Sequence, residues 1–167
     1  MLDNKSVADP IRIRSTIETI SGLPGEGTLN LILLLLGGKV FEDAADQSSG
    51  LYPAWRTCPM VHLAMRSIPH TQTLTAAERK AIADDITFIK GNATKQLAPN
   101  TGGYINEGDA SDPDYRNTFY GANYQTHLAV KNKYDPDYLF YYPTCVGAEQ
   151  FVDQPNSALC IVRSMGP

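Results

Sequence analysis

The segment 28–36 constrains the fold of this chain more than any other part of its sequence. It is apolar at almost every position, and it lies between a turn-forming cluster at 23–27 and the Gly37-Gly38 pair. A bounded apolar run of this length is too short for a typical helix, so it predicts a β-strand. Because apolar residues do not alternate with polar ones, we expect both faces of this strand to be covered.

A second strand is predicted over 59–68. Alternate residues of a strand point to opposite faces, so this segment presents one apolar face and one mixed face. The apolar face carries Val61, Leu63 and Met65, and the mixed face carries Met60, His62, Ala64 and Arg66.

A long helix is predicted from about residue 76 to residue 93. Thr75 followed by Glu78 has the spacing of a capping box, which marks the start of a helix. Ile82, Ile86 and Ile89 recur at helical spacing and should be buried against the sheet formed by the two strands. A fully buried isoleucine contributes roughly 1.5–3 kcal/mol to stability.

The remaining patterns predict shorter elements. These are a helix over 11–21, a polar loop over 42–54, a strand over 104–106, a helix from Gly121 or Asn123 to Tyr134 that ends before Pro136, and a last strand over 159–162. Strands and helices mixed in this order predict an α+β fold, in which an antiparallel or mixed sheet is covered by helices.

The composition disfavours several classes of function. The chain has 167 residues, a net charge of −4 and no basic patch, so a nucleic-acid partner is not expected. Its longest apolar run, 31–36, is far shorter than the roughly 20 residues of a membrane-spanning helix. The N-terminal residues lack the apolar core of a signal peptide, so the chain as it stands is expected to be cytoplasmic, and secretion of a longer parent stays open. The cysteines and histidines lack zinc-ligand spacing, so no metal site is predicted.

Four short motifs follow one another in a fixed order between residues 102 and 140. They are Tyr104-x-Asn106, Phe119-Tyr120-Gly121-x-Asn123-Tyr124, Lys131-x-Lys133-Tyr134-Asp135-Pro136 and Leu139-Phe140. Upstream, Gly37-Gly38 is followed by Pro53-Ala54-Trp55-Arg56. The combination resembles the C-terminal signature of the berberine bridge enzyme-like flavoproteins, which are FAD-linked oxidoreductases of the vanillyl-alcohol oxidase superfamily, and especially of their fungal members.

The resemblance implies that this chain holds only part of such an enzyme. In the family an FAD-binding domain comes first, with an R-x-G-G-H segment whose His is joined to the flavin, and a substrate-binding domain with a large antiparallel sheet follows. This sequence has no G-G-H and no G-x-G-x-x-G loop. We therefore expect residues 1–100 to be part of the substrate-binding domain and residues 101–167 to be the berberine-like segment that completes the flavin pocket, both in one compact unit.

The resemblance also assigns cofactor-binding roles. Tyr104 and Asn106 are expected near the flavin ring or ribityl chain of FAD, and Asn123 and Tyr124 are expected to face the cofactor, so the four should converge on one concave surface. Amide and hydroxyl groups can supply the hydrogen bonds that a reduced flavin needs. Other roles stay open: Asn123 could cap the following helix, and Tyr104 and Tyr124 could be edges of the core.

His62 is the substrate-facing candidate, because it lies on the mixed face of the second strand, where an acid–base role is conceivable. A hydrogen-bonded structural histidine is the alternative, and no catalytic base is assigned. Near the end of the chain, Cys145 and Cys160 fall in segments similar to those of the fungal relatives, C-V-G-x-E and L-C. A disulfide between them and two unpaired thiols are both open.

Three functions are compatible with the sequence. The first is the C-terminal portion of an FAD-dependent oxidase that acts on a small, secondary-metabolite-like substrate and passes hydride to flavin and then electrons to dioxygen; the chain alone would not be an oxidase. The second is a redox-independent cyclase or pericyclase that uses the same pocket. The third is a non-catalytic subunit that pairs with a separate flavin-binding chain or with itself, because an incomplete sheet leaves an open edge.

Overall fold

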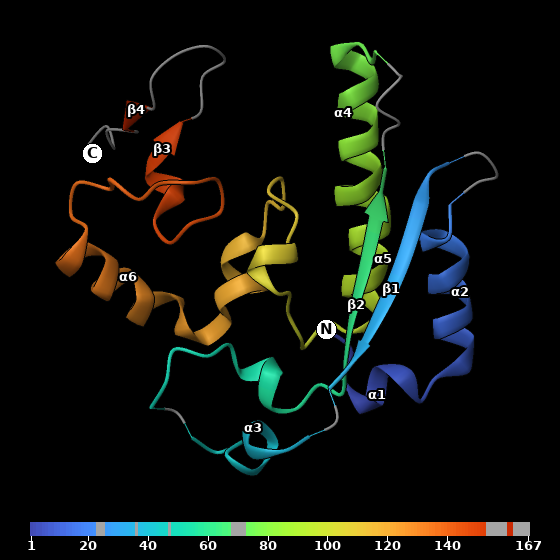
Figure 1. The fold of residues 1–167 in the computed structure, drawn as a ribbon, viewed down its shortest axis with the longest axis horizontal. Helices are drawn as coiled ribbons and strands as arrows, with labels where there is room; N and C mark the ends of the chain where they lie inside the picture. Colours follow the sequence, from blue (N-terminus) through green and yellow to red (C-terminus); the bar gives the residue numbers. More distant parts are fainter. Residues whose placement is uncertain (23–25, 36, 47, 68–72, 153–159, 162–167) are drawn as a thin grey trace, which may run out of the picture.

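The computed structural model describes residues 1–22, 26–35, 37–46, 48–67, 73–152 and the backbone of 160–161. Figure 1 shows two regions in these residues. The hairpin region, residues 1–35 and 60–98, contains a two-stranded antiparallel sheet, here called the hairpin although a long connection joins its strands, and the helices beside it. The tyrosine region, residues 99–152, contains the helix α6 and the turns around it. A connecting segment, residues 37–59, runs between them.

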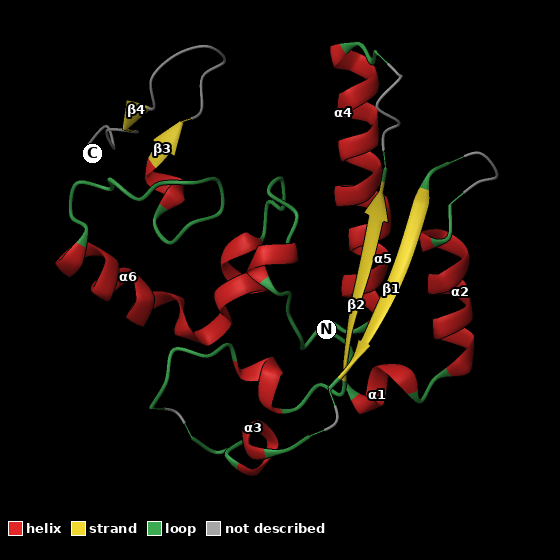
Figure 2. Ribbon diagram, in the orientation of Figure 1, coloured by secondary structure: helices red, strands yellow, loops and turns green. Residues whose placement is uncertain are grey.

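The sheet of the hairpin region pairs β1 (Thr28–Leu34) with β2 (Met60–Arg66). The strands are antiparallel, with Leu31 opposite Leu63. Both strands lie within the segments in which the sequence predicts them. The sheet formed by β1 and β2, together with the helices, gives the expected α+β fold (Figure 2).

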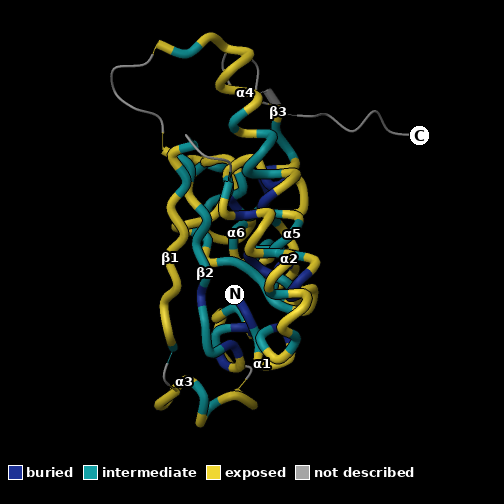
Figure 3. Tube along the Cα trace, turned by 90° about the vertical axis from the view of Figure 1, so that its right-hand side faces the viewer, coloured by how far each residue is buried: buried dark blue, intermediate teal, exposed yellow. Residues whose placement is uncertain are grey.

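Helices lie on one side of the hairpin. α1 (Asn4–Val7) and α2 (Pro10–Ile20) precede β1, and a continuous helix of three parts follows β2, namely α4 (Ala76–Asp84), η2 (Asp85–Lys90) and α5 (Gly91–Leu97). α2 packs on α5, and η2 contacts β2; Figure 3 shows α2 and α5 on the same side of the strands. The predicted capping box is present, because Thr75 Oγ1 accepts from Glu78 N and the Glu78 carboxylate accepts from Thr75 N.

The long helix departs from its predicted apolar stripe at η2. This part is π-helical, so its hydrogen bonds span one more residue than those of an α-helix and shift the angular positions of its later residues, Ile89 among them. Ile82 and Ile86 are half-buried, but Ile89 is 54% exposed. The expected burial is therefore wrong for Ile89, although the helix does pack on the sheet as predicted.

The strand β1 is less covered than its sequence predicts. The side chains of Leu29, Leu31, Ile32, Leu33 and Leu34 are 42–60% exposed. Within the described residues β1 has a neighbouring strand on one side only, which leaves its outer edge open to solvent. The expectation that both faces of this strand are covered is wrong for this chain on its own.

The tyrosine region is built from short turns and one regular helix. η3 (Ile105–Glu107) is a 3₁₀ turn in which Gly108 N donates to Ile105 O at 3.1 Å. This turn satisfies its backbone locally, so the strand predicted over 104–106 is wrong. η4 (Arg116–Tyr120) and η5 (Gly121–Asn123) lead into α6 (Tyr124–Tyr134), which ends before Pro136 as predicted.

The connecting segment and the C-terminal residues contain further short elements. α3 (Lys39–Glu42) and η1 (Pro53–Arg56) lie in the connecting segment, and η6 (Ala148–Gln150), β3 (Phe151–Val152) and β4 (Cys160–Ile161) lie at the C-terminal end. β4 pairs with β3, which confirms the last predicted strand. Cys145 is buried and its thiol is free, so the alternative of a disulfide with Cys160 is not present in this structure. No helix in the described ranges is long and apolar enough to cross a membrane.

Candidate functional site: a cleft between β2 and the tyrosine region

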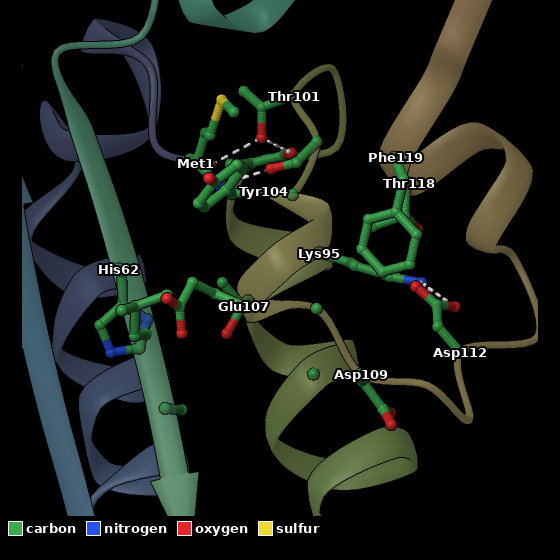
Figure 4. A pocket seen from close by; sticks show the side chains of 18 of the residues that line it. Met1, His62, Lys95, Thr101, Tyr104, Glu107, Asp109, Asp112, Thr118 and Phe119 are labelled. Atoms are coloured by element: carbon green, nitrogen blue, oxygen red, sulfur yellow. Dashed lines mark hydrogen bonds and ion pairs between the residues drawn. The ribbon is translucent and has the colours of Figure 1, made fainter. Parts of the chain in front are cut away.

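A cleft of about 380 Å³ separates β2 from the first part of the tyrosine region. Figure 4 shows β2 with His62 on one side of it, and Asp112, Thr118 and Phe119 on the other. Residues 61–64 of β2 form one wall, the long helix contributes Ile86, Gly91 and Thr94, and the segment 101–119 forms the opposite wall.

Two carboxylates attach the wall opposite β2 to the long helix. Asp112 is buried and accepts two hydrogen bonds from Lys95 Nζ, at 2.6 and 2.8 Å. Asp109 Oδ2 accepts from Thr87 Oγ1 at 2.6 Å. Because Thr87 and Lys95 belong to the helix that covers the sheet, these contacts set the distance between this wall and β2.

Tyr104 and Asn106 form a hydrogen-bonded pair beside the cleft. Asn106 Nδ2 donates to Tyr104 Oη at 2.6 Å. The ring of Trp55 meets the ring of Tyr104 edge to face, with centroids 5.4 Å apart and an interplanar angle of 84°. Tyr104 Oη accepts the bond from Asn106, so its own proton stays available for another acceptor. The structure thus brings these two predicted flavin contacts together and holds the tyrosine ring in place.

Asn123 joins the tyrosine region to the connecting segment. Although it precedes α6, its side chain makes no capping hydrogen bond to that helix. Nδ2 instead donates to Leu51 O at 3.0 Å and to Gly50 O at 3.4 Å. The capping role considered from the sequence is therefore wrong, and Asn123 is a cross-link between distant segments.

Tyr124 points into the tyrosine region rather than into the cleft. It is 6% exposed, and its hydroxyl donates to the Glu149 carboxylate, whose oxygens lie at 2.6 and 2.7 Å. The same hydroxyl accepts from Gly147 N at 3.0 Å. Burial and the hydrogen bond with Glu149 raise the pKa of Tyr124 to about 12. The alternative of a core position, left open by the sequence, describes Tyr124 in this structure.

Glu149 is the common acceptor of two tyrosines. Tyr115 Oη also donates to its carboxylate, at 2.6 Å, and accepts from Glu149 N at 3.1 Å. Burial by itself would raise the pKa of Glu149, but the hydrogen bonds from Tyr115 and Tyr124 outweigh it, and the pKa lies below its usual value. The ionised carboxylate therefore holds the C-terminal segment against η4 and α6.

The four predicted cofactor residues do not line one cleft. Tyr104 lines it, whereas Asn106, Asn123 and Tyr124 lie outside its lining. The ring of Tyr52 wedges between the segments that carry Tyr104 and Asn123: a Cβ on Gly102 would lie 2.3 Å from that ring, and one on Gly121 would lie 2.4 Å from it. Flavin contact by the four residues stays a prediction.

His62 lies on the same sheet face as Asn30, with its Nε2 at 3.0 Å from Asn30 Oδ1 on the neighbouring strand. It borders the cleft and also a second, apolar cavity of about 480 Å³ between the sheet and α2. Burial lowers the pKa of His62 below its usual value, which favours the neutral ring. His62 thus has the hydrogen bond expected of a structural histidine. Contact of His62 with a substrate stays a prediction.

Sequence reasoning did not single out Tyr52 or Glu149. The glycines at 102 and 121 were a signal for Tyr52, because each leaves space that an aromatic ring occupies. Glu149 is the last residue of the C-V-G-x-E segment, but nothing in that segment indicates its partners Tyr115 and Tyr124, which are 34 and 25 residues away in the sequence. In the part of the chain that the structure describes, no group of three or more His, Cys, Asp or Glu side chains could hold a metal ion.

Known proteins are similar to this chain in sequence. A family model described as "Berberine and berberine like" matches residues 103–147, the part that contains the four predicted cofactor residues. The FAD-linked oxidoreductase hmp9 of Hypomyces subiculosus is 51% identical over 160 residues, which are 96% of this chain and 25% of hmp9. The FAD-linked oxidoreductase patO of Penicillium expansum is 37% identical over 67% of this chain and 19% of its own length.

Solved structures share the fold. The crystal structure of the VAO-type flavoprotein MtVAO713 from Myceliophthora thermophila C1 matches 96% of this chain with a TM-score of 0.90 and 47% identity. The VAO-type flavoprotein MtVAO615 from the same organism matches 97% of the chain with a TM-score of 0.81 and 25% identity. The chain covers 28% and 29% of these two proteins. Residues 103–147 carry the berberine-like domain, and nearly the whole chain is similar to FAD-linked oxidoreductases and VAO-type flavoproteins, of whose length it spans about a quarter.

Proposed function

We propose that this chain is the C-terminal portion of an FAD-dependent oxidoreductase that acts on a small organic substrate, and that it supplies one wall of the flavin site. The observation that carries the proposal is the 51% identity, across 96% of the chain, to a protein named an FAD-linked oxidoreductase. The matched residues include both the hairpin region and the tyrosine region, so both would be parts of the proposed enzyme.

The hydrogen-bonding groups beside the cleft fit a flavin. A flavin ring presents acceptors at N1 and C2=O, where negative charge accumulates on reduction. Tyr104 keeps its hydroxyl proton for such an acceptor, because Asn106 donates to its oxygen, and the edge of Trp55 limits rotation of its ring. In the proposed enzyme the hydride acceptor would be bound FAD, and the final electron acceptor would be dioxygen. The residues of this chain would orient the ring system and stabilise its reduced form.

The rest of the proposed enzyme supplies the other wall. This sequence lacks the R-x-G-G-H segment that joins a histidine to the flavin in the family. The chain by itself would then bind flavin weakly and oxidise nothing, and its obligatory partner would be a flavin-binding portion.

The test is a chimera in which this chain replaces the aligned quarter of hmp9. We expect the purified chimera to carry flavin, seen as absorbance near roughly 450 nm, the ordinary band of oxidised flavin, and the isolated chain to be colourless. A chimera that unfolds cooperatively but holds no flavin would contradict the proposal, and so would an isolated chain with stoichiometric FAD. Tyr104→Phe should weaken flavin retention in the chimera, with the exposed Tyr134→Phe as its matched control.

A redox-independent cyclisation is the second candidate. The bifunctional decalin synthase calF of Penicillium decumbens is 33% identical over 119 residues, which are 68% of this chain. In such a protein the apolar sheet face with Leu63 and Met65 would orient a flexible substrate, since proximity and orientation alone can lower a barrier. Anaerobic mixing separates the candidates: an oxidoreductase bleaches its flavin band as substrate is consumed, whereas a cyclase consumes substrate with the band unchanged.

A further inference from the structure

A second cavity, of about 480 Å³, lies between the sheet and α2. α2 packs mainly on η2 and α5 rather than on β1, so space remains between this helix and the strands. Leu2, Ile20 and Leu97 line the cavity and are nearly fully buried, so they form its floor. Ile17 and Ile32 also line it but are 50% and 56% exposed, so the cavity opens to solvent between α2 and β1.

This cavity is distinct from the cleft beside Tyr104. Among the described residues, only His62 and Thr94 line both spaces. The described lining residues of the cavity all belong to the hairpin region, whereas one wall of the cleft belongs to the tyrosine region. The hairpin region therefore builds this cavity by itself.

Most polar side chains of the cavity wall already have partners inside the protein. His62 Nε2 lies 3.0 Å from Asn30 Oδ1, and Asn30 Nδ2 donates to a carbonyl oxygen of α2 at 3.4 Å. The hydroxyls of Ser21 and Thr94 each donate to a carbonyl oxygen of the preceding helical turn, at 2.6 and 3.0 Å. Thr16 is the exception, because no described residue forms a hydrogen bond with its hydroxyl. The wall thus offers one free hydroxyl in largely apolar surroundings.

The cavity carries no fixed charge in the part of the chain that the structure describes. No Asp, Glu, Lys or Arg is among its described lining residues. Burial lowers the pKa of His62 below its usual value, which favours the neutral ring. An ion placed here would lose its hydration without gaining a charged partner, so a neutral occupant is favoured.

Water and polypeptide are poor occupants of such a space. A buried water molecule needs roughly two to four polar partners, and the wall leaves few of them unused. A polypeptide would bring N–H and C=O groups at nearly every residue, and these cost free energy when they are buried without partners. An apolar molecule carries no such cost, and mostly apolar pockets of roughly 300–1,000 Å³ are typical sites for small ligands.

We propose that this cavity is a binding site for one neutral, largely apolar small molecule, such as an aromatic alcohol, whose hydroxyl pairs with Thr16. The molecule enters between Ile17 and Ile32 and lies with its apolar part toward the floor. The site is independent of the proposed function, because it uses no residue of the tyrosine region.

Calorimetric titration of the chain with 2-naphthol tests the site. We expect one molecule to bind per chain. Naphthalene-2-sulfonate has the same rings and a fixed negative charge, and it should bind at least roughly tenfold more weakly, since its charge would be buried without a partner. Absence of 2-naphthol binding would overturn the proposal, and so would equal binding of the two compounds.

A pair of variants places the binding in this cavity. Ile17→Trp should fill the opening and weaken 2-naphthol binding at least roughly tenfold. Ile11→Trp is the matched control, because Ile11 lies on the same helix, is 80% exposed and is outside the lining, so binding should be unchanged. Equal affinities for the two folded variants would place the ligand elsewhere and overturn the proposal. Melting curves establish that each variant is folded.

Thr16→Val tests the hydroxyl without added bulk, and so it does not depend on whether the larger Trp is tolerated. It should weaken 2-naphthol binding by roughly fivefold, the effect of one hydrogen bond, and leave the binding of naphthalene unchanged. Equal losses of affinity for the two compounds would contradict the pairing with Thr16.

The hmp9 chimera distinguishes a small ligand from a segment of the larger protein. We expect the chimera to bind 2-naphthol with the same affinity as the isolated chain, whether or not it holds flavin. Loss of binding in a folded chimera would mean that another segment occupies the cavity, and it would overturn the proposal. The flavin content of the chimera decides the proposed function separately.

Discussion

The hairpin region and the tyrosine region are held together by different interactions. The hairpin region relies on apolar contacts between a sheet and its helices, yet the leucines of β1 remain about half exposed. The tyrosine region buries Phe119, Tyr120 and Tyr124 and directs the tyrosine hydroxyls at acceptors in the same region: Tyr120 Oη donates to Thr144 O at 3.0 Å, and Tyr124 Oη donates to Glu149.

The difference shows which region is complete within this chain. An exposed apolar strand and an unpaired sheet edge are liabilities that proteins normally cover. The buried tyrosines of the tyrosine region have hydrogen-bond partners within the same region, at Thr144 and Glu149. We therefore expect the tyrosine region to be less destabilised than the hairpin region when the rest of the larger protein is absent. We also expect mutations to have larger effects at fully buried positions.

The largest effect is expected at Phe119. Its ring lies under the turn of η3, where a Cβ on Gly108 would come within 2.4 Å of it. Phe119→Ala should lower the free energy of unfolding by about 3–5 kcal/mol, the usual range for a buried Phe. Denaturant titration measures it, with Leu139→Ala as the control because Leu139 is 82% exposed. Similar free energies of unfolding for the two variants would show that burial of Phe119 does not stabilise the tyrosine region.

Tyr124→Phe is expected to have the next largest effect. It keeps the ring but leaves the Gly147 amide without its acceptor and removes a donor from Glu149, which should cost about 1–3 kcal/mol. The exposed Tyr134 supplies the matched Tyr→Phe control. Melting curves of the two variants should separate clearly. If the two melting curves coincide, the hydrogen bonds of Tyr124 contribute no stability beyond the packing of its ring.

Asn123→Ala removes the link between the tyrosine region and the connecting segment. We expect a loss of about 0.5–1.5 kcal/mol in unfolding free energy, typical of one hydrogen bond, measured by denaturant titration. In the hmp9 chimera, a fall in flavin content at unchanged melting temperature would instead indicate direct contact with the cofactor. A fall in stability with full flavin content would indicate the cross-link alone.

The stability of the tyrosine region should depend on pH through the ionisation of Glu149. Its folded-state pKa lies below the usual 4.5, so the carboxylate contributes stability above that value, and this contribution is lost as the pH falls through the folded pKa. The Glu149→Gln variant should have a lower melting temperature than the parent near neutral pH, and the difference should narrow as the pH falls below 4.5 and passes through the folded pKa. Melting temperatures across this range check it. A gap independent of pH would mean that the charge of Glu149 plays no part.

The smallest effect is expected at Ile89, which lies within the π-helical segment η2. Ile89→Ser should change the unfolding free energy by less than about 0.5 kcal/mol, as exposed substitutions usually do. Ile86→Ser, at a half-buried position of the same helix, should cost more. Parallel denaturant titrations compare them. Equal losses of unfolding free energy at the two positions would indicate that Ile89 is buried like Ile86, as the apolar stripe in the sequence predicts.

Local patterns were enough to predict much of this fold. The apolar run of β1, the alternation in β2 and the capping box at Thr75 depend on residues close in sequence, and the motifs from 102 to 140 were enough to recognise the family. These features are decided by short-range physics, namely strand alternation, helix capping and turn preference.

The contacts between distant segments were decided by the tertiary structure alone. The side chain of Asn123 bonds to carbonyls more than seventy residues away, at 72 and 73 positions, instead of capping its own helix. Tyr124 turned inward because Glu149 offers a charged acceptor there, and Ile89 turned outward because a π-helical turn rotates it. A sequence pattern reports which face of an element a residue occupies, but the partner across that face depends on how the elements pack, because hydrogen bonds and burial act over a few ångströms regardless of separation in the chain.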